Sequence, residues 1–228
     1  EMEVIRRKKL IEVALPLDDI NAACAHEKLP GIGAHPRGLH LWWARRPFAS
    51  ARAVIFAQMV DDPSAVPEEF LTSEAQQKER ERLFQIIRDF VPWKNASDEK
   101  IIARARQEIR RSWQRCCEDN KNHPQAAELF NPEVLPAFHD PFAGGGALPL
   151  EAQRLGLESH ASDLNPIPVL INKAMIEIPP QFADMPPVNP GAKQKKSLID
   201  KEWKGVEGLI SDIEYYGQRV YEKAVERM

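Results

Sequence analysis

A cluster of three glycines, Gly144 to Gly146, between an apolar run and a helical pattern constrains the fold of this chain most strongly. The glycines interrupt regular structure at a point where both neighbouring segments are periodic. The pattern alternates strand and helix, with a strand over 134–140, a helix over 147–155, a strand over 158–163 and a helix over 165–175. Because a helix joins the two strands, we expect them to pair in parallel.

The rest of the chain has the pattern of helices. Pro47 is placed to begin a helix that extends to about Met59, and Ser97 is placed to cap a helix that extends to about Cys117. Residues 179–191 contain too many prolines for a regular element, and residues 197–228 read as mostly helical. We predict a mostly helical α/β fold with four parts: an N-terminal region (1–63), a helical insertion (64–133), a Rossmann-like half (134–180), and a proline-rich linker with a C-terminal helix (181–228).

Composition excludes several classes of protein. The 228 residues include 43% hydrophobic residues and carry a net charge of -3, as in globular proteins. The longest nearly uncharged run, 53–60, is too short to span a membrane, and the N-terminus lacks the pattern of a secretory signal. Cys24, Cys116 and Cys117 form neither a disulfide framework nor a zinc knuckle. We therefore expect a cytoplasmic protein that binds no metal.

The glycine turn favours an anionic ligand, because it precedes a helix whose free N–H groups would face that ligand. A purely structural loop is the alternative. Asp163 follows Gly144 by 19 positions, near the spacing at which an acid binds ribose hydroxyls. A dinucleotide fingerprint would need glycine where Pro149 stands, which makes an oxidoreductase the less favoured interpretation, and no P-loop follows. A nucleoside with a charged end remains, and S-adenosylmethionine is the candidate.

Three segments carry a resemblance to a known family. The stretch from Asp140 to Gly146, Asp-Pro-Phe-Ala-Gly-Gly-Gly, resembles the cofactor motif of DNA methyltransferases that modify amino groups. The stretch from Ser162 to Pro166, Ser-Asp-Leu-Asn-Pro, is similar to their second acidic motif. Lys9-Leu-Ile-Glu and the segment from His35 to Pro47 resemble the N-terminal DUF1156 region of adenine-specific DNA methylases with a zinc ribbon. The resemblance implies a partial Rossmann-like methyltransferase fold that uses S-adenosylmethionine.

The resemblance also implies roles for individual residues. Asp140, Phe142, Gly144 and Gly146 would line the methionine end of the cofactor, Asp163 would hold the ribose hydroxyls, and Asn165 would border the adenine. Arg46 and Pro47 would close over the cofactor's carboxylate. The full set expected to bind cofactor is Asp140, Pro141, Phe142, Gly144, Gly145, Gly146, Asp163, Leu164, Asn165, Arg46 and Pro47.

A second set of side chains is expected to contact double-stranded DNA. It combines arginines with tryptophans, which suit phosphate contact and base stacking: Arg37, Trp42, Trp43, Arg45 and Arg52. The alternative is that the tryptophans are core residues and the arginines pair with acids. For His35 and His40 we expect a loop-stabilising role rather than one as general bases, and for Arg104, Arg111 and Arg115 a solvated helix face.

The chain lacks the D/N/S-P-P-Y/F motif with which amino-methylating enzymes hold the target nitrogen. Ile178-Pro-Pro-Gln181 and Met185-Pro-Pro-Val188 have only the prolines, and the cysteines of a zinc ribbon are missing. We therefore expect the N-terminal portion of a DNA adenine N6-methyltransferase of a restriction-modification or phage-defence system. Its catalytic residues would lie in the rest of the enzyme or in a partner subunit, and the unpaired sheet edge could mediate dimerisation. Methylation of RNA or another amine, and a non-catalytic cofactor- or DNA-binding subunit, are the alternatives.

Overall fold

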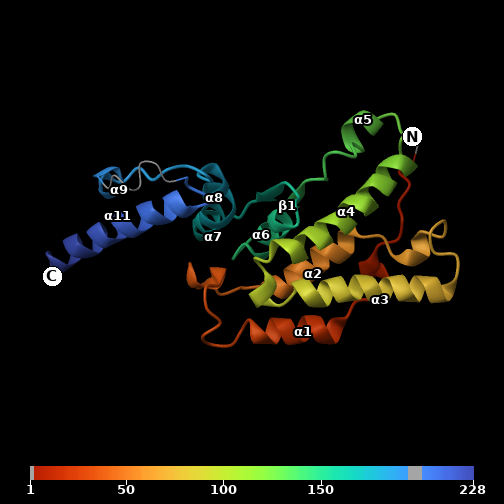
Figure 1. The fold of residues 1–228 in the computed structure, drawn as a ribbon, viewed down its shortest axis with the longest axis horizontal. Coiled ribbons are helices and arrows are strands. Elements are labelled where there is room, and N and C mark those ends of the chain that lie inside the picture. Colours follow the sequence, from red (N-terminus) through yellow and green to blue (C-terminus); the bar gives the residue numbers. More distant parts are fainter. Residues whose placement is uncertain (1–2, 195–201) are drawn as a thin grey trace. The chain divides into compact units, whose positions relative to one another are not determined.

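The computed structural model describes residues 3–194 and 202–228, and the chain divides into two compact units, with the boundary in the sequence between Ile171 and Asn172. Both units are mainly helical (Figure 1). Within the described ranges, no helix combines the length and apolar character needed to cross a membrane. The mostly helical character expected from the sequence is confirmed.

Four long helices build most of the first unit: α1 (Leu17–His26), α2 (Phe48–Met59), α3 (Ser73–Phe90) and α4 (Glu99–Asp119). Helix α2 packs against α1, α4 and α6 (Ala147–Arg154), so it is surrounded by other helices (Figure 1). Its sequence is accordingly apolar on nearly every face, and Phe56 packs edge-on against Phe90 of α3 with ring centroids 5.3 Å apart. The core therefore lies around α2.

Short elements connect these helices. They are η1 (Leu10–Glu12), η2 (Pro36–Gly38), η3 (Pro63–Ala65), η4 (Trp93–Asn95) and α5 (Ala126–Leu129). Two expected helix starts are corrected by one residue. Pro47 precedes α2 with extended backbone instead of opening it, and Asp98 rather than Ser97 caps α4. The Asp98 carboxylate reaches two amides of the first turn, at 3.0 and 3.2 Å, which explains why it replaces the serine.

The sheet consists of two parallel strands, β1 (Phe138–Asp140) and β2 (Ser159–Ala161), joined through α6. Phe138 pairs with Ser159 and Asp140 with Ala161. The parallel pairing is confirmed, but both strands are shorter than expected. Pro136 has no N–H to donate, which explains why β1 begins only at Phe138. The described residues contain no further strand, so a complete Rossmann-like sheet is not observed.

A buried ion pair joins α2 to α6. The Arg52 guanidinium donates to both carboxylate oxygens of Glu151, at 2.8 and 3.1 Å, and both side chains are almost completely buried. The same guanidinium donates to the backbone oxygens of Phe90 and Val91 at the end of α3. This network holds three helices around one charge pair.

Helix α7 (Pro166–Asn172) ends at the boundary, and the second unit continues with the π-helical turn η5 (Lys173–Glu177). It also contains α8 (Ile178–Gln181), α9 (Pro190–Gln194) and α11 (Glu207–Val225). The proline-rich stretch 179–191 was expected to hold no element, and this is wrong. Pro179 and Pro180 lie in the first turn of α8 and Pro190 begins α9, where a missing N–H costs no hydrogen bond, whereas Pro186 and Pro187 lie between the two helices. Of the helix expected over 197–228, residues 197–201 lie outside the described residues.

Candidate functional site

The glycine turn follows β1 directly and is shaped by local hydrogen bonds. Asp140 accepts a hydrogen bond from the Phe142 amide at 3.0 Å, and the Gly146 amide donates to the Ala143 oxygen at 2.8 Å. Gly144 and Gly146 have φ of 49° and 75°, in the left-handed region that favours glycine, and Gly146 caps α6. The turn thus delivers the chain from β1 into α6 within a few residues.

Asp163 connects the ends of the two strands. One carboxylate oxygen accepts from the Gly144 amide at 3.0 Å, and the other accepts from the Asn165 amide at 2.9 Å. The amides of Asn165 and Gly144 hold the pKa of Asp163 below its usual value, so this carboxylate is ionised at neutral pH. Each carboxylate oxygen can accept a further hydrogen bond from a ligand.

The loop before α2 lies against the glycine turn. A Cβ added to Gly144 would come within 3.2 Å of Trp42 Nε1, and one added to Gly145 would lie 3.8 Å from Arg45 Cγ. This close approach, together with the positive φ of Gly144, disfavours a side chain at that position. Two segments that are about a hundred residues apart in sequence therefore form adjoining walls.

These walls enclose a cavity of about 520 Å³. This size is within the usual range for small-molecule and cofactor sites. The lining residues come from the loop and α2, from the glycine turn and α6, and from the segment after β2: Glu27, Lys28, His35, Pro36, Arg37, His40, Trp42, Trp43, Ala44, Arg45, Arg46, Pro47, Phe48, Asp140, Phe142, Ala143, Gly144, Gly145, Ala147, Leu148, Asp163 and Ile171. The cavity lies entirely within the first unit.

The N-terminus of α2 forms part of this cavity and is already bound by a carboxylate of the chain. Glu27 accepts from the amides of Phe48 and Ala49, at 2.8 and 2.9 Å. Its side chain is only 4% exposed, and burial raises the pKa of its carboxyl group above the usual value. The amides of Phe48 and Ala49 are therefore not free to bind an anionic ligand.

His35 lies beside Glu27 and is packed between two aromatic rings. Its ring centroid is 5.1 Å from that of Phe48 and 4.3 Å from that of Trp93. Nδ1 accepts from the Arg37 amide at 3.2 Å, so the neutral ring carries its proton on Nε2. Burial, followed by neighbouring guanidinium charges, lowers the pKa of His35 to about 4, which makes the ring neutral at physiological pH.

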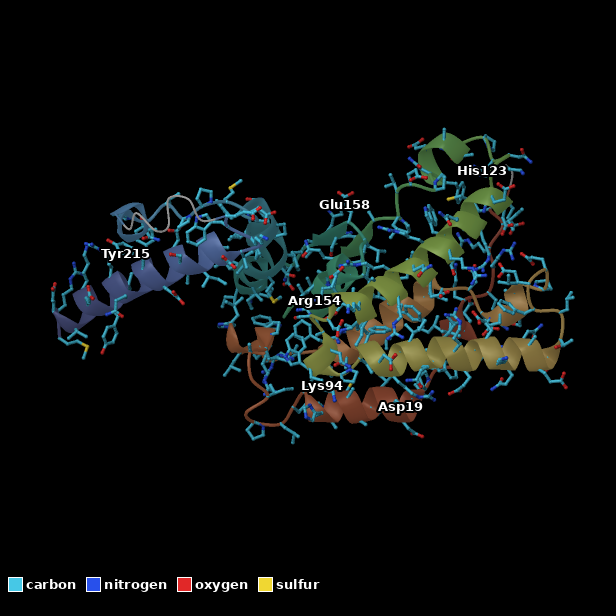
Figure 2. The ribbon with its side chains drawn as sticks, viewed as in Figure 1. Asp19, Lys94, His123, Arg154, Glu158 and Tyr215 are labelled. Atoms are coloured by element: carbon cyan, nitrogen blue, oxygen red, sulfur yellow. The ribbon has the colours of Figure 1, made fainter. Side chains whose placement is uncertain are left out.

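Trp93 holds the loop from outside the cavity. Its Nε1 donates to the Ala34 oxygen at 2.9 Å, and the guanidinium groups of Arg52 and Arg154 lie 5.8 and 5.2 Å from its ring centroid. Figure 2 labels Arg154, which is at the end of α6. The loop is thereby linked to the same helices that carry the buried ion pair.

Of the residues expected to bind cofactor, most line the cavity: Asp140, Phe142, Gly144, Gly145, Asp163, Arg46 and Pro47. The other four, Pro141, Gly146, Leu164 and Asn165, are outside the lining. Asn165 instead precedes α7 and caps its first turn, since its side chain accepts from the Ile167 amide at 2.9 Å. Leu164 is 96% exposed.

Four of the five residues expected to contact DNA also line the cavity: Arg37, Trp42, Trp43 and Arg45. Arg37 donates to the backbone oxygens of Glu27 and Leu29 and so stabilises the loop. Arg45 and Arg46 are exposed, and within the described part of the chain the structure gives their guanidinium groups no hydrogen bond or ion pair. They are therefore open to a ligand.

Arg52 requires a correction. It was expected to contact DNA, but it is 2% exposed and its guanidinium is fully engaged by Glu151 and two backbone oxygens. The arginines of α4 are also more engaged than a solvated face implies. Arg104 pairs with Asp89, and Arg111 and Arg115 pair with Glu69.

The sequence did not single out Glu27 or Trp93. Glu27 meets the amides of Phe48 and Ala49 across more than 20 positions, and no local pattern announces such a contact. His35 was recognised only as a loop residue. As for metals, no three or more His, Cys, Asp or Glu side chains in the described residues are placed to hold an ion.

A family model matches part of the chain. Residues 14–86 match the model of a family, DUF1156, that is described as a protein of unknown function. No curated protein and no solved structure matches the chain. The expected resemblance to DUF1156 is thus confirmed over 14–86. The match extends beyond residue 63, where this region was expected to end, and reaches into α3. It contains the loop from His35 to Pro47 and excludes the glycine turn.

Proposed function

We propose that this chain carries the cofactor-binding portion of an S-adenosylmethionine-dependent DNA adenine N6-methyltransferase. The observation that carries the proposal is the single cavity that brings the glycine turn, Asp163 and the loop from His35 to Pro47 together. These are the segments whose sequences resemble that family, and they are far apart along the chain. A glycine turn with a purely structural role does not explain why Asp163 and the cationic loop line the same cavity.

The chemistry of the lining supports a charged nucleoside ligand. Asp163 is an ionised acceptor at the carboxyl end of the parallel strands, where ligands bind in folds of this kind. Asp140 adds a second carboxylate at the same edge, and Trp43 and Phe142 supply exposed aromatic faces. Carboxylates suit ribose hydroxyls and a positive sulfonium, and aromatic faces suit a purine.

S-adenosylmethionine supplies a methyl group that an amine can accept by direct displacement, without a covalent enzyme intermediate. This chain would bind and orient the cofactor and exclude water from it. The polar and aromatic groups that hold a flipped adenine would come from the rest of the enzyme or from a partner subunit. Arg45 and Arg46 are the exposed cations best placed to contact a nucleic-acid phosphate near the cavity.

Calorimetric titration of S-adenosylmethionine into the 228-residue chain tests the proposal. We expect binding that Asp163→Ala weakens by about tenfold or more, as is typical when a charged hydrogen-bond acceptor is lost. Glu158→Ala is the matched control, because Glu158, labelled in Figure 2, is an exposed carboxylate next to β2 and is not among the residues that line the cavity. NAD serves as the competing dinucleotide.

Equal affinities of the Asp163→Ala and wild-type proteins for S-adenosylmethionine would contradict the proposed contact between Asp163 and the ribose. No binding by a folded sample would favour the non-catalytic subunit instead. Preference for NAD would favour the oxidoreductase.

A further inference from the structure

His35 lines the cavity and carries a buried hydrogen-bond donor that has no partner among the described residues. Its side chain is 4% exposed, and no hydrogen-bond acceptor for Nε2 is found among the described residues. Oε2 of Glu27 lies 3.8 Å from Nε2, which is too far for a hydrogen bond. Buried polar groups without partners are rare in folded proteins and call for an explanation.

The donor state of His35 Nε2 follows from its surroundings. Nδ1 accepts from the Arg37 amide at 3.2 Å, so the single proton of the neutral ring must be on Nε2. Burial of the ring, followed by the charges of the nearby guanidinium groups, opposes a second proton. The ring therefore offers one N–H to an acceptor and cannot itself accept at that nitrogen.

Glu27 offers the complementary group. Each of its carboxylate oxygens accepts one amide from the first turn of α2, which leaves each oxygen able to accept one more donor. A donor and an anionic acceptor thus lie 3.8 Å apart in the wall of one cavity. A ligand that satisfies both must carry an acceptor and a donor close together.

The charges around the pair select among such ligands. Four guanidinium groups, those of Arg37, Arg45, Arg52 and Arg154, act on His35 and favour an anion as its acceptor. A simple anion, however, would be repelled by the carboxylate of Glu27. A ligand with a carboxylate beside an ammonium group meets both demands, because the ammonium can face Glu27.

We propose that His35 and Glu27 form the subsite for a zwitterionic α-amino-acid head group. The ligand carboxylate accepts from His35 Nε2, and its ammonium donates to Glu27. The inference rests on the proposed function, in which this head group is the methionine end of the cofactor. The proposed subsite also gives the hydrogen bonds between Glu27 and the first amides of α2 a role, because they hold the Glu27 carboxylate in the position where it would bind the ammonium group.

Two ligands that differ only in the head group separate this subsite from the rest of the cavity. S-adenosylhomocysteine has the amino-acid head, and 5′-methylthioadenosine keeps the nucleoside and the thioether but lacks it. We expect His35→Phe, which keeps the ring stacking, to weaken S-adenosylhomocysteine about tenfold and 5′-methylthioadenosine less than twofold in calorimetric titration. Glu27→Gln should give the same contrast. Glutamine keeps the size of the side chain, but its neutral amide does not attract the ammonium group of the ligand.

Two controls match the local structure of these positions. His123, labelled in Figure 2, also accepts through Nδ1 from an amide two residues later, at 3.2 Å, and packs against an aromatic ring. It is not among the residues that line the cavity. Asp98 caps α4 as Glu27 caps α2. We expect His123→Phe and Asp98→Asn to bind both ligands with wild-type affinity, and thermal melts establish that every variant is folded.

Equal weakening of both ligands by His35→Phe and Glu27→Gln would overturn the inference and place the pair at the nucleoside. Unchanged affinity for both ligands would also overturn it. In either case the proposed function would stand, because the wild-type chain still binds. Failure of the wild-type chain to bind either ligand would instead overturn the proposed function together with this subsite.

Discussion

The two walls of the cavity are built in different ways. The strand-end wall, residues 140–146 with Asp163, is held by hydrogen bonds to backbone groups, which join either near neighbours in the sequence or the ends of the two paired strands. The loop wall, residues 27–48, is held by side chains that reach distant segments, such as the hydrogen bond from Trp93 to Ala34. The first wall is therefore specified locally, and the second exists only when the helical core is assembled.

Both walls depend on the ion pair between Arg52 of α2 and Glu151 of α6, so removing it should affect them together. We expect Glu151→Ala to lower the free energy of unfolding by about 3–5 kcal/mol, because Arg52 would keep a buried charge without its partner. Urea unfolding measures this change. The exposed Glu158 provides the control, and Glu158→Ala should change the free energy by less than about 0.5 kcal/mol. A loss below about 1 kcal/mol for Glu151→Ala would show that the walls are held independently.

A substitution at Gly144 should disturb the contact between the walls, whereas the same substitution at Gly145 should leave it intact. Gly144 has φ of 49° and faces Trp42, whereas a Cβ at Gly145 meets only ordinary contacts at 3.8 Å or more. We expect Gly144→Ala to lower the free energy of unfolding by about 1–2 kcal/mol and Gly145→Ala to lower it much less. Urea unfolding of the two variants measures the difference. Equal effects would mean that the turn does not require the left-handed conformation or the close approach of Trp42.

The loop wall should also respond to pH through His35. Its pKa is lowered to about 4 in the folded protein, against about 6.5 in the unfolded chain. The unfolded state therefore takes up a proton first as pH falls, so the contribution of His35 to stability is complete above pH 6.5 and is lost between about pH 6.5 and 4. We expect a smaller fall in melting temperature between pH 7 and 5 for His35→Phe than for the wild type.

His123→Phe is the control for this pH dependence and should keep the wild-type slope. Identical slopes for His35→Phe and wild type would contradict the buried, neutral state assigned to His35.

Much of the strand-end wall could be predicted from the sequence, because its causes are local. The glycines, the acid 19 positions later and the intervening helix pattern implied parallel strands with a turn between them. The loop wall was foreseen only in part. Trp42, Trp43, Arg45 and Arg46 were singled out, but Arg52 was assigned to DNA although it is buried. Its partner Glu151 lies 99 positions away, and nothing near Arg52 in the sequence signals that pairing.

The central claim is that the two walls bind one ligand together. Hydrogen–deuterium exchange of the 228-residue chain, with and without S-adenosylmethionine, tests it most directly, because the method reports on both segments in one experiment. We predict slower exchange in peptides from both 34–46 and 142–146 when the ligand is added. Protection of one segment alone, or of neither while the ligand is bound elsewhere, would contradict the account.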